Sequence, residues 1–319
     1  NGSEAIGGYE TLGFAGFFAG AIRYTDVLGG DSADLCPVLI APNHDITEEP
    51  APDAADAVGR QVAGVNRLAG AESAFHAAKE ALAAPFALAE AAGWVAGPLS
   101  AAKTLTPALS AGIRRTLRDT LAPAAPTIID LSAMPHDEQV LFAQVALTTM
   151  GLVRGFGRLV VLCAHGSTTE NNPYQASLDC GACGGNPGAV NARAAAAIFN
   201  DPTVRAALAP RGITIPEDTV FVAALHDTVA DTITVLDPHL VPDTHATELA
   251  EFIVHARAAA DHLVRERATT LPGAHPHQSL ARLRARAHDW ADAHPALGLA
   301  GHAALLLGPA TGCHRSPDT

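Results

Sequence analysis

The chain has 319 residues, 48% of them hydrophobic, which is enough to bury a large core. Its formal net charge is −13, with eighteen Arg and only two Lys, so it lacks the basic surface that nucleic-acid binding requires. Five unevenly spaced Cys argue against a disulfide framework and favour metal binding or a reactive thiol.

The two ends of the sequence indicate a fragment of a longer protein. The chain opens on Asn1 without a Met or an apolar signal segment, and it stops shortly after an apolar run. That run, residues 296–312, is interrupted by Gly, Pro and a His. We therefore expect no transmembrane helix in this sequence.

The first part of the chain contains one ambiguous segment, one expected strand and a long helical region. Residues 9–24 ("YETLGFAGFFAGAIRY") are aromatic and Gly-rich, and fit either a helix or a close-packed loop near a site. Residues 36–42 ("CPVLIAP") predict a short strand in which Cys36 is a small core residue. Residues 51–120 are Ala-rich with a helical period, which indicates a helical insertion. Its period is interrupted at Pro85, Gly93, Gly97, Pro98 and Pro107.

The middle of the chain alternates strands and helices. Residues 126–131 predict a strand, and residues 135–152 predict a helix with acids in its first turn and a Gly at its end. The apolar run 159–162 predicts a buried strand, closed by a turn at Ala164-His165-Gly166.

The remaining elements continue this alternation. We expect helices at 190–200, 201–213, 245–268 and 279–292, and strands at 218–228, 231–237 and 301–309. Asp201 should cap the second helix, with Pro202 at its first position. Strands alternating with helices predict an α/β fold with a parallel sheet. We divide the chain into 1–50, the start of an α/β core, 51–122, the helical insertion, and 123–319, the rest of the core.

The stretch 163–193 ("CAHGSTTENNPYQASLDCGACGGNPGAVNAR") gathers a His, three Cys and several Gly directly behind the expected strand. Thiolate sulfur and neutral imidazole are the ligands that zinc prefers, and His165 and Cys180 are the candidates. Two alternatives stay open: a Cys180/Cys183 redox pair, and simple packing of small apolar thiols. Cys163, at the end of the apolar run, fits the packing alternative.

Three further features of the sequence bear on function. Unpaired N–H groups at the start of the following helix could hold a small anion such as bicarbonate. His226-Asp227, at the end of an expected strand, lie where α/β sheets present site residues. The basic residues Arg265 and Arg267 indicate an ordinary solvated helix face.

The loop carries a resemblance to a known family. Residues 159–201, from "LVVLCAHGS" to "AAAAIFND", closely resemble DabA, the zinc-binding subunit of the DAB energy-coupled inorganic carbon pump. The resemblance extends over most of the chain, including the runs at 9–19, 86–93, 211–237, 265–272 and 289–309.

This resemblance implies a fold, a reaction and partners. It implies a β-carbonic-anhydrase-like core that holds Zn²⁺ and hydrates CO2 to bicarbonate, together with a cation-conducting membrane subunit, DabB. The protein would then lie peripherally at the cytoplasmic face of the bacterial cell membrane. The family's zinc-binding His and Cys correspond to His165 and Cys180, and Cys183, Gly166 and Ser167 are further candidates for the metal site.

One part of the family's site has no counterpart here. The other two zinc ligands belong to a Cys-x-Asp-x-Arg segment that should lie just before residue 9, and residues 1–8 ("NGSEAIGG") do not contain it. The gate Asp and Arg of the β-carbonic anhydrase scheme are in that segment. We therefore expect no catalytic residue within this chain, and weak or no zinc binding and no hydration activity when it is alone.

Overall fold

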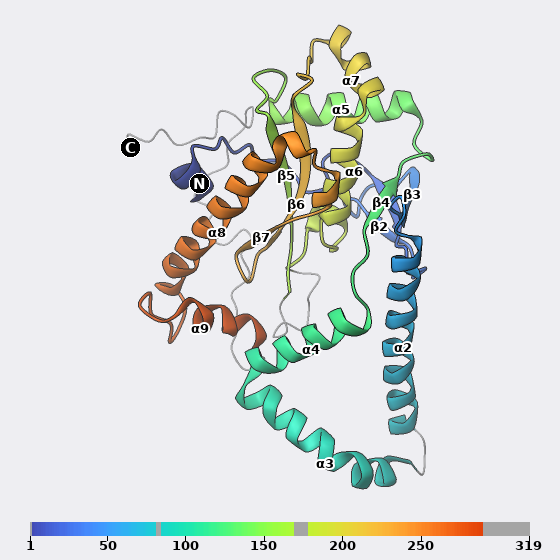
Figure 1. Ribbon diagram of the computed structural model, residues 1–319, viewed down its shortest axis with the longest axis vertical. Coiled ribbons are helices and arrows are strands. Elements are labelled where there is room, and N and C mark those ends of the chain that lie inside the picture. The colour runs from blue at the N-terminus through green and yellow to red at the C-terminus, as the bar shows by residue number, and fades with distance from the viewer. Residues whose placement is uncertain (1, 81–83, 169–177, 290–319) are drawn as a thin grey trace.

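The computed structural model describes residues 2–80, 84–168 and 178–289, which form two mixed β-sheets surrounded by helices (Figure 1). The first sheet has the strand order β2-β1-β3-β4. Its strands are β1 (Ile22–Thr25), β2 (Ala33–Leu35), β3 (His44–Pro50) and β4 (Thr127–Asp130). β1 runs parallel to β3, and the two outer pairings are antiparallel.

The second sheet carries the Cys/His loop. It has the order β5-β6-β7, with β5 (Leu159–Gly166), β6 (Val220–Asp227) and β7 (Thr232–Val235). β5 and β6 are parallel, whereas β7 returns antiparallel to β6. The expected parallel sheet is thus correct for one strand pair in each sheet, and the described residues form a mixed α/β fold.

The helices lie around and below these sheets. Their bounds are α1 (Gly2–Gly7), α2 (Ala55–Glu80), α3 (Ala84–Leu105), α4 (Pro107–Leu121), α5 (His136–Met150), α6 (Ala189–Asn200), α7 (Pro202–Leu208), α8 (Ala246–Ala268) and α9 (Leu280–Ala285). α6 and α8 flank the β5–β7 sheet, while α2, α3 and α4 extend away from both sheets (Figure 1). Over the part of the chain described, no helix is both long enough and apolar enough to cross a membrane.

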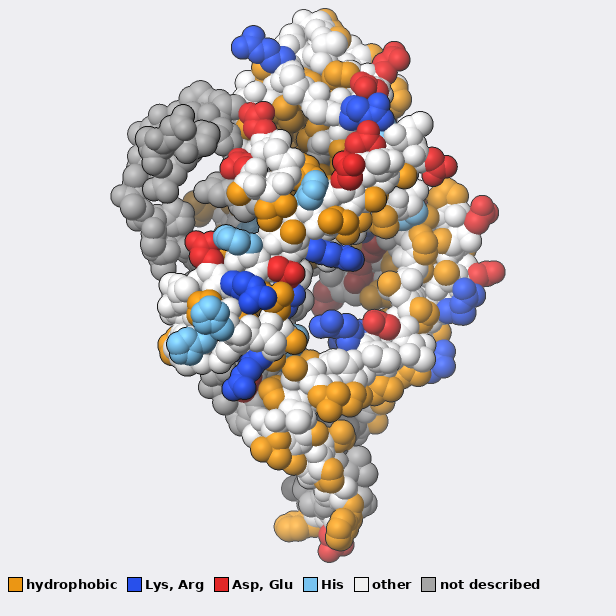
Figure 2. All heavy atoms as spheres, turned by 60° about the vertical axis from the view of Figure 1, so that its left-hand side comes forward, with side chains coloured by type: hydrophobic (Ala, Val, Ile, Leu, Met, Phe, Trp, Pro, Cys, Tyr) orange, Lys and Arg blue, Asp and Glu red, His pale blue; other side chains and the backbone are white. Residues whose placement is uncertain are grey.

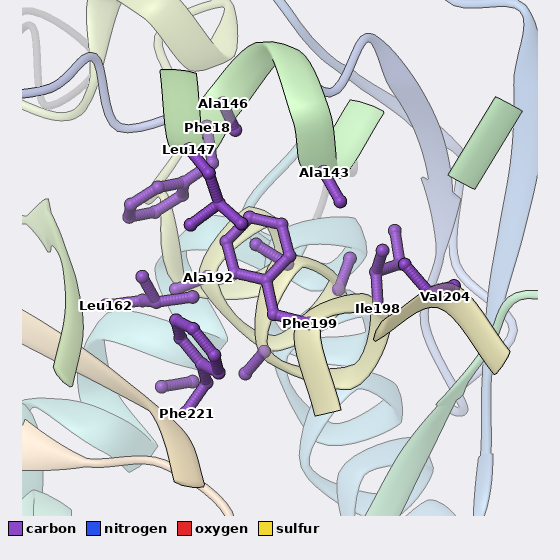
Figure 3. Close-up of a cluster of buried hydrophobic side chains, with 14 of the residues drawn as sticks. Phe18, Ala143, Ala146, Leu147, Leu162, Ala192, Ile198, Phe199, Val204 and Phe221 are labelled. Carbon is purple, nitrogen blue, oxygen red and sulfur yellow. The ribbon is translucent and has the colours of Figure 1, made fainter. Parts of the chain in front are cut away.

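The main core surrounds α6. Phe199 of this helix is fully buried, and its ring lies 5.1 Å from that of Phe221 on β6 and 5.9 Å from that of Phe142 on α5. Leu162 of β5 and Leu147 of α5 complete the contact between the sheet and the two helices (Figure 3). This packing fixes β5, and so His165, against α6.

Most expected elements after residue 125 are confirmed. α5 ends at Gly151, which adopts φ 79°, and Asp201 caps α7 through the N–H groups of Thr203 and Val204. Several expected elements differ in extent. β5 continues through Gly166 instead of turning at 164–166, and the helix expected over 201–213 is α7 followed by a 3-10 turn at Ala209–Arg211. The helix expected over 279–292 is α9 followed by a 3-10 turn at Arg286–His288, and its last three residues lie outside the described residues. The strand expected at 301–309 lies outside the described residues.

The strand expected at 36–42 is wrong. β2 ends at Leu35, and the chain then turns, with the N–H of Ile40 bonded to the carbonyl of Pro37. Pro37 has no N–H to offer a sheet, and the Cys36 thiol donates to the carbonyl of Ile40 instead. Cys36 is nevertheless buried, as expected.

The region expected to be helical contains α2, α3 and α4. Pro107 does separate two helices, but α3 runs through Gly93, Gly97 and Pro98, so these residues do not break it. β3 and β4, which lie on either side of this region in sequence, pair with each other. The division into parts at 1–50, 51–122 and 123–319 stays a prediction.

Candidate metal centre

His165 and Cys180 belong to two segments that the backbone brings together. His165 is the penultimate residue of β5, and Cys180 precedes a 3-10 turn at Gly181–Cys183. The loop folds back on itself, since the N–H of Cys180 donates to the carbonyl of Asn186 at 3.1 Å. The N–H of Gly188 then donates to the carbonyl of His165 at 2.9 Å. The loop therefore returns to the end of β5, as its glycines suggested.

The two candidate ligands are hydrogen-bonded neighbours. A hydrogen bond from the Cys183 thiol lowers the pKa of Cys180 to about 4, and the His165 ring acts in the same direction against the opposing effect of burial. The same contact with Cys180 raises the pKa of His165. Nδ1 of His165 is buried and has no hydrogen-bond partner among the described residues. The pair is thus an imidazole beside a thiolate, with one ring nitrogen unused.

Cys183 stabilises the Cys180 thiolate by a hydrogen bond. It is completely buried, and its hydrogen bond to Cys180 raises the pKa of Cys183 above its usual value. In this arrangement Cys183 is the protonated donor and Cys180 the charged acceptor. The same contact would also bring the two sulfurs together in the redox alternative.

Gly166 and Ser167 line the neighbouring turn through their backbone. The N–H of Ser167 donates to Oδ1 of Asp179 at 2.8 Å, and a Cβ built on Gly166 would lie 3.3 Å from the same oxygen. Burial raises the pKa of Asp179. Asp179 is not among the site residues predicted from the sequence, although it lies directly before Cys180.

The aromatic, Gly-rich segment 9–24 is not a helix: residues 9–20 form a loop, here called the 9–20 loop, that covers this site, and the segment ends in β1. A Cβ on Gly16 would lie only 2.9 Å from Sγ of Cys180, so the loop backbone presses directly on the thiolate. The buried amide of Asn191, on α6, holds the loop by donating to the carbonyl of Gly20 at 3.1 Å and that of Leu35 at 3.0 Å. At the start of the loop, the Tyr9 hydroxyl is hydrogen-bonded to Nδ1 of His255 on α8 at 2.9 Å.

His226 lies beside His165, because the two residues face each other in the parallel β5–β6 register. Its Nε2 is 3.5 Å from the buried carboxylate of Asp231, which also pairs with Arg267 at 2.8 Å. Arg267 is therefore not on a solvated face, contrary to expectation. Asp227 instead accepts the N–H groups of Val229 and Ala230 in the turn after β6.

Cys163 is exposed, which contradicts its expected role as a core residue. Side chains alternate along β5, so Leu162 and Ala164 face α6 and are buried while Cys163 points to the other face. An apolar run in the sequence does not reveal which of its members faces the core.

The donor set fits half of a zinc site. Imidazole and thiolate are zinc ligands. The buried Nδ1 of His165, which has no partner among residues 2–80, 84–168 and 178–289, is a polar atom that coordination could satisfy. Across residues 2–80, 84–168 and 178–289, however, no three or more His, Cys, Asp and Glu side chains are arranged to hold a metal ion. A complete tetrahedral site would need further ligands beyond these two.

Known proteins similar to this chain share one description. A family model for the "Probable inorganic carbon transporter subunit DabA" matches residues 3–315. The relative of that name from Natronomonas pharaonis is 40% identical over 318 residues, covering 96% of this chain and 38% of the relative. The relative from Novosphingobium aromaticivorans is 38% identical over 325 residues (96% and 36%), and that from Legionella pneumophila strain Lens 34% over 315 residues (96% and 41%).

Two facts qualify this likeness. The chain spans only 36 to 41% of the length of these three relatives. No solved structure matches it, so the fold rests on the structure described above. The family model nevertheless covers nearly every residue, including the whole Cys/His loop, and the chain belongs to the DabA family of probable inorganic carbon transporter subunits.

Proposed function

We propose that the chain supplies half of a zinc site at which CO2 is hydrated to bicarbonate, within an energy-coupled inorganic carbon pump. The observation that carries this proposal is the contact of His165 with the Cys180 thiolate at a strand end, with Nδ1 of His165 buried and without a hydrogen-bond partner in the described part of the chain. The parallel β5–β6 pair at this site is compatible with a β-carbonic-anhydrase-like core.

Each residue of the site has a distinct task in this proposal. His165 and Cys180 hold the metal, which when bound lowers the pKa of a coordinated water to near neutrality, about 7. Cys183 stabilises the Cys180 thiolate by a hydrogen bond, and the 9–20 loop excludes water from its other side. Two remaining ligands and the gate Asp and Arg come from the part of the protein that the longer relatives possess beyond this match.

A partner and a location belong to the same proposal. We propose that the complete protein acts with a cation-conducting membrane subunit of the DabB type, and that it lies peripherally at the cytoplasmic face of the bacterial membrane. The relatives' description as transporter subunits supports a partner of this kind.

Elemental analysis of zinc tests the proposal. A protein extended to the full length of the relatives should retain about one zinc per chain, and the 319-residue chain close to none. His165→Ala and Cys180→Ser should each abolish retention in the extended protein, whereas Cys163→Ser, at an exposed cysteine of the same strand, should not. Full zinc in the His165→Ala protein would disprove the assignment.

A thiol-redox or structural-zinc protein without carbonic anhydrase activity is the second candidate, because the Cys183 thiol is hydrogen-bonded to the Cys180 thiolate. Thiol titration with and without a chelator separates a thiol-redox protein from a zinc site, and a CO2 hydration assay of the zinc-loaded extended protein separates a catalytic zinc from a structural one. A redox pair would lose two titratable thiols reversibly upon oxidation regardless of chelator, whereas a zinc site would protect Cys180 only when metal is present.

A further inference from the structure

Helix α3 exposes large apolar side chains at the end of the molecule. Phe86 is 83% exposed, Trp94 87% and Leu105 78%. Single exposed apolar residues are ordinary, but these three share one helix that lies away from both sheets (Figure 1). Because these exposed apolar side chains lie together on one helix, we expect another molecule to cover this surface in the functional protein.

Helix α4 continues this surface with an apolar stripe that is exposed in the part of the molecule that the structure describes. Leu109, Ile113, Leu117 and Leu121 recur every four residues, which places them along one side of the helix. All four are exposed, whereas the small Ala111 is the buried residue of this helix. α4 therefore packs through a small residue and turns its large apolar residues to solvent. Figure 2 shows hydrophobic side chains gathered at the tapering lower end, where α3 and α4 lie.

The charge of these helices is opposite to that of the chain. α3 and α4 carry four basic residues, Lys103, Arg114, Arg115 and Arg118, against two acidic ones, Glu90 and Asp119. The whole chain has a net charge of −13. Arg115 and Arg118 are exposed on the same helix as the leucine stripe. The α3–α4 surface is thus apolar and basic on an otherwise acidic protein.

We propose that the α3–α4 surface, formed by the exposed apolar and basic residues of these two helices, binds the protein to an anionic lipid surface. Leucines on one side and arginines on the other are what an interfacial helix needs: the apolar face enters the acyl boundary and the guanidinium groups meet phosphates. Exposed Trp and Phe suit the same depth, because their rings favour the headgroup region. The acidic remainder would be repelled by anionic headgroups, so this end is the one that can approach them.

This inference deepens the peripheral location proposed above but is independent of zinc, since vesicle binding needs no metal. Trp94 supplies the probe. The chain contains two Trp, so Trp290→Phe leaves Trp94 as the sole tryptophan. Its fluorescence is recorded with vesicles of phosphatidylglycerol and phosphatidylcholine, and with vesicles of phosphatidylcholine alone, using the full 319-residue chain.

The expected result is a blue shift of Trp94 emission with the anionic vesicles, little with phosphatidylcholine alone, and reversal by salt. Leu109→Glu with Leu117→Glu should weaken vesicle binding at least about tenfold, since both side chains would leave the acyl boundary. Arg115→Gln with Arg118→Gln should weaken it about tenfold or more without touching the apolar stripe. Leu141→Glu with Val254→Glu, at exposed sites of α5 and α8, is the matched control and should bind as the parent does.

Three results would overturn the inference. The first is an unchanged Trp94 emission with anionic vesicles. The second is equal binding of the α4 variants and the control pair, with circular dichroism showing all of them folded. The third is a blue shift that appears only with membranes containing the partner subunit, which would assign this surface to protein docking. Loss of zinc binding with vesicle binding retained would instead disprove only the proposed hydration site.

Discussion

Cys180 keeps its position because the backbone around it is built largely from glycines. A Cβ on Gly16 would approach its sulfur to 2.9 Å, and a Cβ on Gly188, at the end of the loop, would lie 2.8 Å from Cβ of Ala164 on β5. Such close approach is possible only without side chains. The glycines of the loop are therefore part of the site, although they supply no ligand.

Gly184 and Gly181 provide a matched test of this conclusion. Gly184 adopts φ +68°, and its Cβ would lie 2.7 Å from the backbone oxygen of Asp34, whereas a Cβ on Gly181 would meet nothing within 4 Å. Gly184→Ala should lower the free energy of unfolding by about 1–3 kcal/mol. Gly181→Ala should change it by less than about 0.5 kcal/mol, measured by urea unfolding. Equal effects would show that the loop relaxes freely.

The Cys180 thiolate should be visible in the metal-free chain. Its pKa of about 4 lies far below the ordinary 9.0, so its ultraviolet thiolate absorbance should appear in a step near pH 4. Cys180→Ser should remove that step and Cys163→Ser should not. Because the folded-state pKa is depressed, the stabilisation from this thiolate is complete above pH 9 and is lost progressively as the pH falls towards 4. A single step at the ordinary thiol pKa would contradict the described contacts.

At the scale of elements, α6 and α7 connect the site to the core. α6 starts directly after Gly188 and holds the 9–20 loop through Asn191, while α7 begins at a side-chain cap. The cap is Asp201, which accepts the N–H of Thr203 at 2.7 Å and that of Val204 at 3.1 Å. The sequence predicted both helix starts, that of α6 from the glycines before it and that of α7 from the pair Asp201-Pro202.

Removing this cap should destabilise the protein measurably. Asp201→Ala leaves two N–H groups at the start of α7 without their acceptor and should cost about 1 kcal/mol of unfolding free energy. Asp201→Asn keeps an acceptor oxygen and should cost clearly less. Thermal and urea unfolding of both variants would test this, and an equal loss in the two would show that charge rather than capping matters.

Over the whole molecule, Arg193 joins the two sheets. Its guanidinium donates to Glu48 of β3 at 2.6 Å, to Asp237 after β7 at 2.5 Å and to Thr127 of β4. Burial would raise the pKa of Glu48, but hydrogen bonds from Thr127, Tyr24 and Arg193 lower it below its usual value. The network lies beside a cavity of about 270 Å³ between β4, α6 and the end of β7.

Arg193→Met should be strongly destabilising, because it leaves two largely buried carboxylates, Glu48 at 12% and Asp237 at 18% exposure, without their cation. We expect a loss of about 3 kcal/mol or more in unfolding free energy. Arg158→Met is the control: Arg158 pairs with Glu248 at 2.7 Å but is well exposed, and its loss should cost under about 1 kcal/mol. Similar losses in the two variants would show that the sheets are held together by other contacts.

Whether a segment was predictable depended on how local its determinants are. α5, α6, α7 and α8 follow from apolar period and capping residues. The turn at 36–42 was misread because its apolar residues are exposed, and α3 passes through Gly93 and Pro98 although both disfavour a helix. Arg193 was not identified because its partners Glu48, Thr127 and Asp237 are remote in sequence. Asp179, in contrast, lies directly before Cys180 and was overlooked.

By itself, the sequence determined the α/β class, the starts of the helices after residue 125 and the family. Capping, periodicity and the Cys/His loop each depend on residues that are close together in the sequence. It also marked His165 and Cys180 as partners in one loop. The tertiary structure alone decided that β7 runs antiparallel and that Cys163 faces outward. It also decided that Cys183 donates to the Cys180 thiolate and that the leucines of α4 lie in solvent. These features depend on contacts made in the folded chain, because burial and charge pairing arise only when segments that are separate in the sequence come together.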